Sequence, residues 1–239
     1  EEIQLIAGVG TGREVEDWLK LVDEQTQATL RALTRETILS GNDHKIEDLI
    51  ANCPAQISIL FLHGKWTQAS VSALRLTNSE PGILTSTTHV MNNLKAELVM
   101  LLGRASTPVQ KFSLQNMILV QMHLCDLFQN LVTHNIDSEN AFEYLKTPRL
   151  QMDEQTQSLV VLGAGAHVRY GYDYEGLSER MVVTPTTDRC TIGFLNSLTV
   201  SMCCAFVGPA NHGKSSVVKE IGKLIGRFVA VVNCQEHLD

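Results

Sequence analysis

The sequence contains no run of clustered lysine and arginine residues, and its 239 residues carry a formal net charge of −7. Proteins that bind nucleic acid regardless of its sequence need clustered basic side chains, so the charge argues against this class. The longest apolar stretch, around Phe194–Ala210, is interrupted by polar residues and is too short to span a bilayer. The first residues, Glu1–Ile3, lack the charged and apolar regions of a signal peptide. We therefore expect a cytoplasmic protein with no nucleic-acid partner and no membrane insertion.

The usual metal-binding and nucleophile motifs are also missing. Six cysteines stand at positions 53, 125, 190, 203, 204 and 234, none of them in a C-x-x-C pair or at zinc-finger spacing from a histidine. The eight histidines show no H-E-x-x-H spacing, and there is no G-x-S-x-G nucleophile elbow. We interpret the cysteines as small apolar residues in a reducing compartment, with Cys203 and Cys204 in a buried strand.

The first part of the chain has the apolar spacing of helices, and 44% hydrophobic residues suffice for a folded core. This spacing predicts helices over Val15–Leu39, about Lys45–Leu74, about His89–Gly103, and after residue 107. Pro54 either divides the second helix or begins a new one. Asn78–Thr88 is predicted to be a loop. Thr107 as N-cap, Pro108 in the first helical position and Gln110 as capping-box partner mark the start of the last helix.

The pattern changes near residue 150 from helical to extended. Short extended runs around Gly163–Gly165 predict a hairpin or paired strands, and Val168 stands where a dinucleotide fingerprint would need its third glycine. Further on, the sequence predicts alternating helices and strands over about Asp188–Val200, Met202–Val207, Lys214–Ile225 and Phe228–Asn233. Gly226 would end the second of these helices. This order predicts one βαβ unit of a parallel sheet.

Residues 208–215 read G-P-A-N-H-G-K-S and match the phosphate-binding pattern G-x-x-x-x-G-K-[ST] in full. In this pattern a strand turns sharply into a helix, so that backbone N–H groups and the helix N-terminus point at a phosphate. Lys214 would supply positive charge to the β- and γ-phosphates, and Ser215 would offer its hydroxyl to Mg²⁺ as the metal ligand. The expected ATP- or ADP-binding residues are Gly208, Pro209, Ala210, Asn211, His212, Gly213, Lys214, Ser215 and Ser216.

Several motifs around this loop resemble those of a known family. Residues 170–176 read Y-G-Y-D-Y-E-G, residues 182–190 read V-V-T-P-T-T-D-R-C, and residues 232–234 read V-N-C. In order and spacing they are similar to the entry to the first AAA+ module of dynein heavy chains, which typically shows Y-G-Y-E-Y-L-G-N, V-I-T-P-L-T-D-R-C, G-P-A-G-T-G-K-T and V-x-N-C. Upstream, Val15–Leu19 resembles the V-E-x-W-L of the family's linker, and Phe142–Leu145 its F-E-W-L.

The resemblance implies a fold and a nucleotide site. The expected fold is a mostly α linker rod over residues 1–168, followed by a partial α/β P-loop AAA+ module over residues 169–239 with an incomplete parallel sheet. Thr187 and Asp188 are expected to cap the helix that follows the adenine-binding segment. The residues that the resemblance implies for wrapping the adenine are Val182, Val183, Thr184 and Pro185.

The resemblance also implies a function. The family's linker lies across a ring of six AAA+ modules, and nucleotide turnover in the first module changes its shape, which moves cargo or a neighbouring microtubule. The implied function is that of a motor ATPase on the cytoskeleton, in a cilium or flagellar axoneme. Its implied partners are the remainder of the ring and linker, dynein intermediate and light chains, and microtubules reached through other parts of the chain.

Two loop residues depart from the family's pattern. Asn211 replaces a glycine, which keeps the loop shape accessible because asparagine tolerates left-handed dihedral angles. His212 replaces a threonine and either adds a titratable donor near the phosphates or faces solvent. Asp239 comes before any Walker B acidic pair, sensor or arginine finger, so we expect a piece of a larger chain that does not hydrolyse ATP unaided.

Two other interpretations remain open. One is a divergent dynein-like scaffold that is catalytically weak or inactive, in which nucleotide binding only stabilises the fold. The other is an unrelated P-loop switch or kinase with an N-terminal helical domain. That second interpretation predicts a complete NTPase core within the chain.

Overall fold

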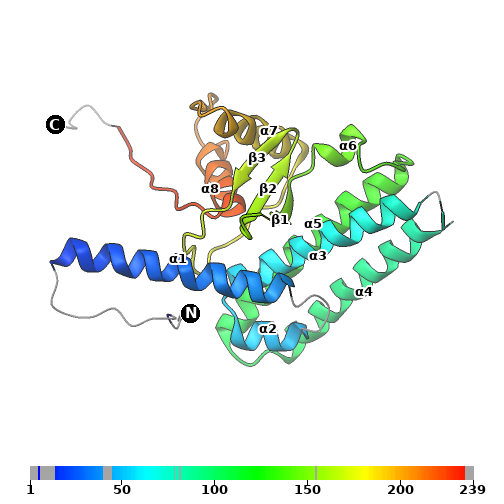
Figure 1. Ribbon diagram of the computed structural model, residues 1–239, viewed down its shortest axis with the longest axis horizontal. Coiled ribbons are helices and arrows are strands. Elements are labelled where there is room, and N and C mark those ends of the chain that lie inside the picture. Colours follow the sequence, from blue (N-terminus) through cyan, green and yellow to red (C-terminus); the bar gives the residue numbers. More distant parts are fainter. Residues whose placement is uncertain are drawn as a thin grey trace.

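The computed structural model describes residues 5, 14–39, 45–77, 79–80, 82–153 and 155–234. These residues form a mostly helical structure with one small sheet (Figure 1). The helices are α1 (Val15–Leu39), α2 (Ile46–Asn52), α3 (Ala55–Leu76), α4 (Ile83–Arg104), α5 (Pro108–Thr133), α6 (Phe142–Leu145), α7 (Pro185–Thr199) and α8 (Lys214–Ile225). The strands are β1 (Arg149–Met152), β2 (Leu159–Gly163) and β3 (Ala166–Arg169).

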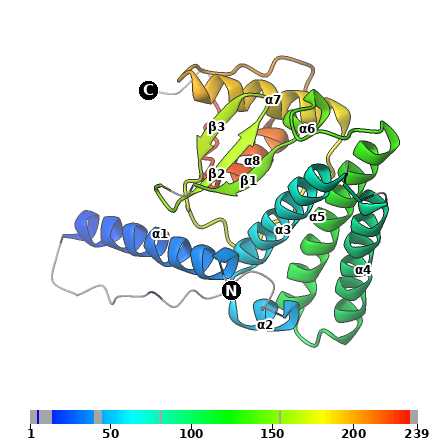
Figure 2. The same cartoon turned by 45° about the vertical axis from the view of Figure 1, so that its right-hand side comes forward.

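Helices α3, α4 and α5 lie side by side and enclose the first of two apolar cores (Figure 2). Phe128, Leu98 and Met117 are fully buried in it, and Tyr144 of α6 closes one end. Helix α1 projects away from this bundle, and its first turns leave Val15 68% exposed. None of the helices in the described ranges is long and apolar enough to cross a membrane.

The helix starts follow local rules, with one exception. Pro54 divides the second predicted helix into α2 and α3. At the start of α5, the Thr107 hydroxyl accepts a hydrogen bond from the backbone N–H of Gln110 at 3.2 Å, which is one half of the expected capping box. The predicted loop over Asn78–Thr88 is wrong at its end, because α4 already begins at Ile83. The Thr87 and Thr88 hydroxyls donate to carbonyls one turn earlier, so these polar residues fit within the helix.

The sheet is an antiparallel meander in the order β1-β2-β3, as the extended runs around residue 163 predicted. Ala164 and Gly165 both have positive φ (49° and 87°) and form the two-residue turn between β2 and β3. The sheet lies between α1 and α3 on one side and α7 and α8 on the other (Figures 1 and 2). This second core contains Leu30, Ile57, Leu60, Leu150, Leu159, Val161, Ala166, Tyr170, Tyr172, Leu195 and Ile225.

The predicted parallel sheet is not present in the described part of the chain. The two predicted strands would lie in the segments before and after α8 in sequence. Neither segment, 202–209 or 227–234, forms a strand or pairs with one. Their apolar side chains are accordingly uncovered, since Val207 is 94% exposed and Phe228 74% exposed. Cys203 and Cys204, which we expected in a buried strand, are exposed for the same reason. A strand of a parallel sheet needs at least one neighbouring strand and cover on both faces, and the described chain provides neither for these residues.

The C-terminal end of α8 is held against the sheet by a close contact at Gly226. This residue ends α8 in the left-handed conformation (φ 63°), as predicted for a helix-ending glycine. A Cβ atom added there would lie 2.3 Å from the ring of Tyr170. The backbone N–H of Asp173 also donates to the Gly226 carbonyl at 2.9 Å. Only glycine fits both the backbone angle and the space beside the tyrosine ring.

We therefore expect Gly226→Ala to lower the free energy of unfolding by about 2–4 kcal/mol, from left-handed strain and from overpacking. Gly103→Ala is the matched control, because a Cβ at Gly103 meets nothing within 4 Å. Alanine there should leave stability unchanged or raise it by up to about 1 kcal/mol. Urea unfolding of the two variants checks this, and equal midpoints would contradict the contact.

Candidate functional site

The glycine loop, residues 208–213, leads directly into α8. Asn211 and Gly213 both adopt the left-handed conformation (φ 60° and 77°), so asparagine occupies the glycine position as expected. The first backbone N–H of this region to find a helical acceptor is that of Val217, which donates to the Gly213 carbonyl at 3.0 Å. The N–H groups of the three preceding residues stand at the helix N-terminus and have no backbone acceptor within the described ranges.

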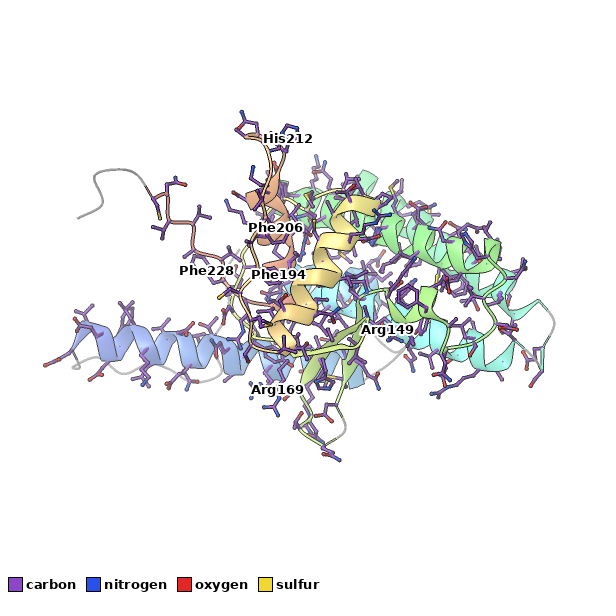
Figure 3. The ribbon with its side chains drawn as sticks, turned by 90° about the horizontal axis from the view of Figure 1, so that it is seen from above. Arg149, Arg169, Phe194, Phe206, His212 and Phe228 are labelled. Atoms are coloured by element: carbon purple, nitrogen blue, oxygen red, sulfur yellow. The ribbon has the colours of Figure 1, made fainter. Side chains whose placement is uncertain are left out.

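Two side chains, one from the glycine loop and one from the first residue of α8, bond to carbonyl groups of the loop. The Lys214 ammonium donates to the carbonyl oxygens of Gly208, at 2.9 Å, and Pro209. One ring nitrogen of His212 lies 2.8 Å from the Ala210 carbonyl. The His212 ring is exposed at the tip of the loop and points away from the molecule (Figure 3). The structure thus favours the solvent-facing interpretation of this histidine.

The segment expected to wrap an adenine ends at the start of α7. Thr184 is the N-cap, and its hydroxyl accepts from the Thr187 backbone N–H at 3.4 Å while the Thr187 hydroxyl accepts from the Thr184 N–H at 2.8 Å. Pro185 takes the first helical position, where its fixed φ is suited to a helix. The expectation that Thr187 and Asp188 cap this helix is therefore wrong in detail. The helix begins three residues earlier, Thr187 is the reciprocal partner, and Asp188 lies in the first turn.

A cavity of about 180 Å³ lies between α5, α7, α8 and the segment before α7. Val182 and Val183 form one wall of the cavity, called the valine wall below. Val217, in the first turn of α8, also lines the cavity. Of the predicted nucleotide-site residues, only the two valines line this cavity. Thr184, Pro185, the glycine loop and the first three residues of α8, 214–216, are not part of its lining. The structure thus brings the two valines to α8, whereas the glycine loop is not part of the same cavity.

Two histidines, His63 of α3 and His123 of α5, also line this cavity. Burial lowers the pKa of His63 to about 3, with the positive charges of Arg180 and His123 acting in the same direction. Burial likewise lowers the pKa of His123, against the attraction of Asp188 and of Asp126. Both imidazoles are therefore neutral near pH 7 and can donate or accept hydrogen bonds. Sequence reasoning missed them because they stand on α3 and α5 at ordinary helical positions.

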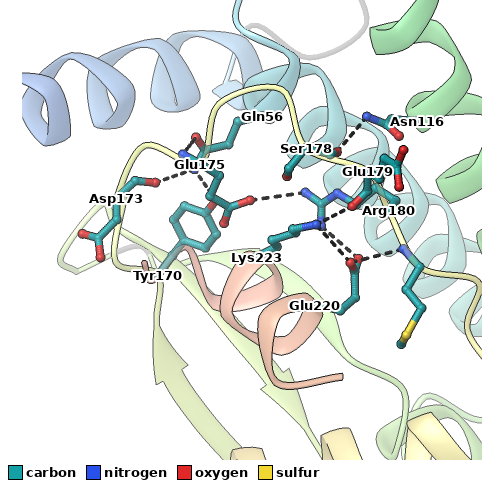
Figure 4. A network of polar contacts seen from close by, with 11 residues as sticks. Gln56, Asn116, Tyr170, Asp173, Glu175, Ser178, Glu179, Arg180, Glu220 and Lys223 are labelled. Carbon is teal, nitrogen blue, oxygen red and sulfur yellow. Dashed lines mark hydrogen bonds and ion pairs between the residues drawn. The ribbon is translucent and has the colours of Figure 1, made fainter. Parts of the chain in front are cut away.

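A buried group of charges lies beside the cavity, shown in Figure 4. Arg180 forms an ion pair with Glu220 of α8 at 3.2 Å, and its other terminal nitrogen is 3.6 Å from Glu175. Glu220 also accepts from the backbone N–H of Met181 at 3.3 Å. Lys223, one turn further along α8, donates to the Glu179 carbonyl. Two side chains of α8 therefore hold three consecutive residues, 179–181, that lead directly into the valine wall.

The chain just before these residues, from Tyr170 to Ser178, is bonded to two helices of the N-terminal part, α3 and α5. Gln56 of α3 donates to the Tyr170 hydroxyl at 2.8 Å and to the Asp173 carbonyl at 3.0 Å. Asn116 of α5 donates to the Ser178 carbonyl at 3.0 Å. Residues 170–181 thus form a continuous connection from α8 to α3 and α5 (Figure 4).

Glu175 is an unusual member of this group, because the resembling family pattern has leucine at its position. One of its carboxyl oxygens is buried without a hydrogen-bond partner. Burial raises the pKa of Glu175 to about 8, although the nearby Arg180 and Lys223 act in the opposite direction. A carboxyl group that is costly to ionise therefore stands beside the arginine.

Comparisons with known proteins place these features in a family context. Residues 170–239 match the family model described as the hydrolytic ATP binding site of dynein motor region. The whole chain is 27% identical to dynein axonemal heavy chain 5 of Mus musculus, of which it covers 5%. It is 26% identical over its whole length to the dynein gamma chain of the flagellar outer arm of Chlamydomonas reinhardtii, and 28% identical to dynein axonemal heavy chain 1 of Homo sapiens, covering 5% and 6% of them. The chain spans only a small part of these relatives.

We expect Glu175→Gln to change how stability depends on pH. A carboxyl whose pKa rises on folding from 4.5 to about 8 takes up a proton when the chain folds between these pH values. The free energy of unfolding of the wild-type chain should therefore fall as pH rises through this window. The variant has no such group, so at pH 8 it should be the more stable by on the order of 1–3 kcal/mol, and near pH 5 about equal.

Urea midpoints at pH 5, 6.5 and 8 measure this difference. Glu139→Gln is the control, because its carboxylate pairs with the exposed Arg75 and is itself accessible to water. Parallel pH profiles for wild type and Glu175→Gln would show that this carboxyl group ionises normally in the folded chain.

Proposed function

We propose that this chain, which belongs to the dynein heavy-chain family, binds ATP with Mg²⁺ at the glycine loop and couples nucleotide binding to its helical segment. The observation that carries the proposal is the conformation of the loop at the start of α8. Asn211 and Gly213 adopt the left-handed conformation, and the first N–H groups of the helix have no backbone acceptor in the described chain. Such a helix start favours an anionic ligand.

Lys214 supports the assignment of phosphate as that ligand. Its ammonium group lies over the glycine loop and bonds the carbonyls of Gly208 and Pro209. A phosphate held at the helix start would offer this ammonium a charged acceptor, and charge-assisted hydrogen bonds are the stronger kind. Ser215 follows in the first helical turn with an exposed side chain, free to reach a magnesium ion bound by the same phosphates.

The cavity beside α8 is the proposed place for the base. Its wall of Val182 and Val183 offers apolar surface to an aromatic ring, and it extends to Val217 in the first turn of α8. Mostly apolar cavities with a few polar groups are usual for such ligands. In this proposal, Thr184 and Pro185 contribute by starting α7 and so fixing where the valine wall ends.

Coupling to the helical segment would run through residues 170–181. These residues are bonded to α8 by Glu220 and Lys223, and to α3 and α5 by Gln56 and Asn116. We propose that residues 1–168 form the linker segment and 169–239 the start of the first AAA+ module, with an axonemal, microtubule-based role for the parent protein. The curated relatives are themselves named axonemal or flagellar dynein chains. The parent's partners would be the rest of the ring, dynein intermediate and light chains, and microtubules.

The alternative within the same family is a scaffold in which nucleotide is bound but not turned over. This alternative is suggested by Asn211 and His212, which depart from the family's loop pattern. ATPase rates of the parent heavy chain with and without Lys214→Ala distinguish the two. A rate that depends on Lys214 supports the motor, and nucleotide binding without such turnover supports the scaffold.

We expect Lys214→Ala to weaken ATP binding by on the order of 30-fold or more, because it removes the charge that faces the phosphates. Lys219→Ala is the matched control, since Lys219 is an exposed residue of the same helix. Isothermal calorimetry with MgATP measures both variants. ATP affinity that is the same in Lys214→Ala and wild type would exclude the glycine loop as the phosphate site.

Ser215→Ala tests the magnesium assignment separately. The wild-type protein should bind ATP more tightly with Mg²⁺ than with EDTA, because the Ser215 hydroxyl completes the metal's ligands. The variant should bind ATP about equally in the two conditions. A magnesium effect of undiminished size in Ser215→Ala would remove this residue from the metal site.

A further inference from the structure

Arg180 connects one part of the proposed nucleotide site, the valine wall, to α8, the helix that follows the other part, the glycine loop. The glycine loop and the valine wall, Val182–Val183, are separated in sequence by the whole of α7 and the segment after it. Charged side chains connect the stretch before the valine wall to α8. Arg180 and Met181 come directly before the wall, and both bond Glu220, six residues after the helix start at Lys214. We propose that Arg180 is a positioning residue. It holds the valine wall against α8, so that the wall can contact the base and increase the affinity for nucleotides over ligands that have phosphates alone.

The geometry of Glu220 supports this role. One of its carboxyl oxygens is 3.2 Å from the Arg180 side chain, and the other accepts from the Met181 backbone N–H at 3.3 Å. A single carboxylate thus holds both a side chain and the backbone of the next residue. This arrangement restrains the direction in which the chain leaves residue 181, and so where Val182 lies.

The burial of the pair makes the connection strong and directional. The Arg180 side chain is 10% exposed and that of Glu220 is 20% exposed, so water competes with the bond only weakly. A guanidinium presents its donors in a rigid plane, whereas a lysine ammonium at this position would keep the charge and lose that fork. The pair should therefore depend on arginine itself as well as on positive charge.

Glu175 adds a feature particular to this chain. Its carboxyl group lies 3.6 Å from Arg180 on the side opposite Glu220, in a place where the family's pattern has leucine. It lies by the other terminal nitrogen of the guanidinium, so Arg180 is shared between two carboxyl groups. Glu175→Leu would leave the arginine to Glu220 alone.

The inference rests on the proposed function and predicts a split between two ligands. ATP contacts both the glycine loop and the valine wall, whereas tripolyphosphate has no base and contacts only the loop. In the parent heavy chain, Arg180→Gln, Arg180→Lys and Glu220→Gln should each weaken MgATP binding roughly tenfold. Magnesium tripolyphosphate binding should change less than about twofold, since the loop and Lys214 are untouched. Glu175→Leu should keep or improve MgATP affinity.

Calorimetry with the two ligands measures this split. Only the ligand binding that is lost in Lys214→Ala is assigned to this site. Arg75→Gln is the control, because its ion pair with Glu139 lies away from the cavity and is exposed. The reversed pair, Arg180→Glu with Glu220→Arg, should recover part of the lost ATP affinity. A structural role alone would not give this recovery together with unchanged tripolyphosphate binding.

The outcomes separate this inference from the proposed function. Equal losses for ATP and tripolyphosphate, or no loss of ATP binding in any Arg180 or Glu220 variant, overturn the positioning role while Lys214-dependent binding stands. If thermal unfolding shows that Arg180→Gln is not folded, the binding of Arg180→Lys and Glu220→Gln tests the positioning role instead. Wild-type protein without Lys214-dependent ATP binding overturns the proposed function and the positioning role with it.

Discussion

The seating of α8 on Tyr170 is the contact on which the rest of this structure depends. The Tyr170 ring fills the space that a side chain at Gly226 would take, and its hydroxyl accepts a hydrogen bond from Gln56 of α3. The next residue, Gly171, donates its N–H to the Ile225 carbonyl at 2.8 Å. Since a helix is stiff over three turns, fixing its last residue also fixes the direction of its first. The glycine loop therefore takes its place from a tyrosine at the far end of the helix.

The charged and polar contacts of residues 170–181 add to this seating of α8. Residues 170–181 touch α8 at its end through Tyr170 and at its middle through Glu220 and Lys223, while Gln56 and Asn116 hold them to α3 and α5. A displacement at the start of α8 would change the geometry of several hydrogen bonds at once. Interfaces of this kind are suited to two discrete arrangements rather than to gradual deformation. The coupling proposed between nucleotide and helical segment would take this route.

Much of the fold could be predicted from local sequence, and the failures have physical reasons. The start of α5 at Thr107, the division at Pro54 and the end of α8 at Gly226 are confirmed, because capping and glycine geometry act within a few residues. The predicted loop over Asn78–Thr88 overlaps the start of α4 at Ile83, where the threonine hydroxyls donate to carbonyls of the same helix. The parallel sheet was predicted from two apolar runs that have strand-like sequences but no neighbouring strands in the described chain. Strand pairing depends on partners distant in sequence, which spacing cannot supply.

The candidate site divides in the same way. The glycine loop was predicted from an eight-residue pattern, and the structure has the helix start and the left-handed Asn211 and Gly213 but, within the described residues, no strand before the loop. His63, Glu220 and Gln56 could not be found from sequence, because they lie at ordinary positions of two helices, α3 and α8, and their partners reach them only through tertiary packing. Glu175 could have been singled out, since it departs from the family's leucine at a position that proves to be buried.

Hydrogen exchange of the parent heavy chain with and without MgATP tests the central claim most directly. Exchange at a backbone amide slows when the amide donates to a bound phosphate or is shielded by a base. Nucleotide should slow exchange in peptides covering residues 208–217 and residues 180–185 together. Unchanged exchange in both peptides while ATP is bound elsewhere in the protein would contradict the account.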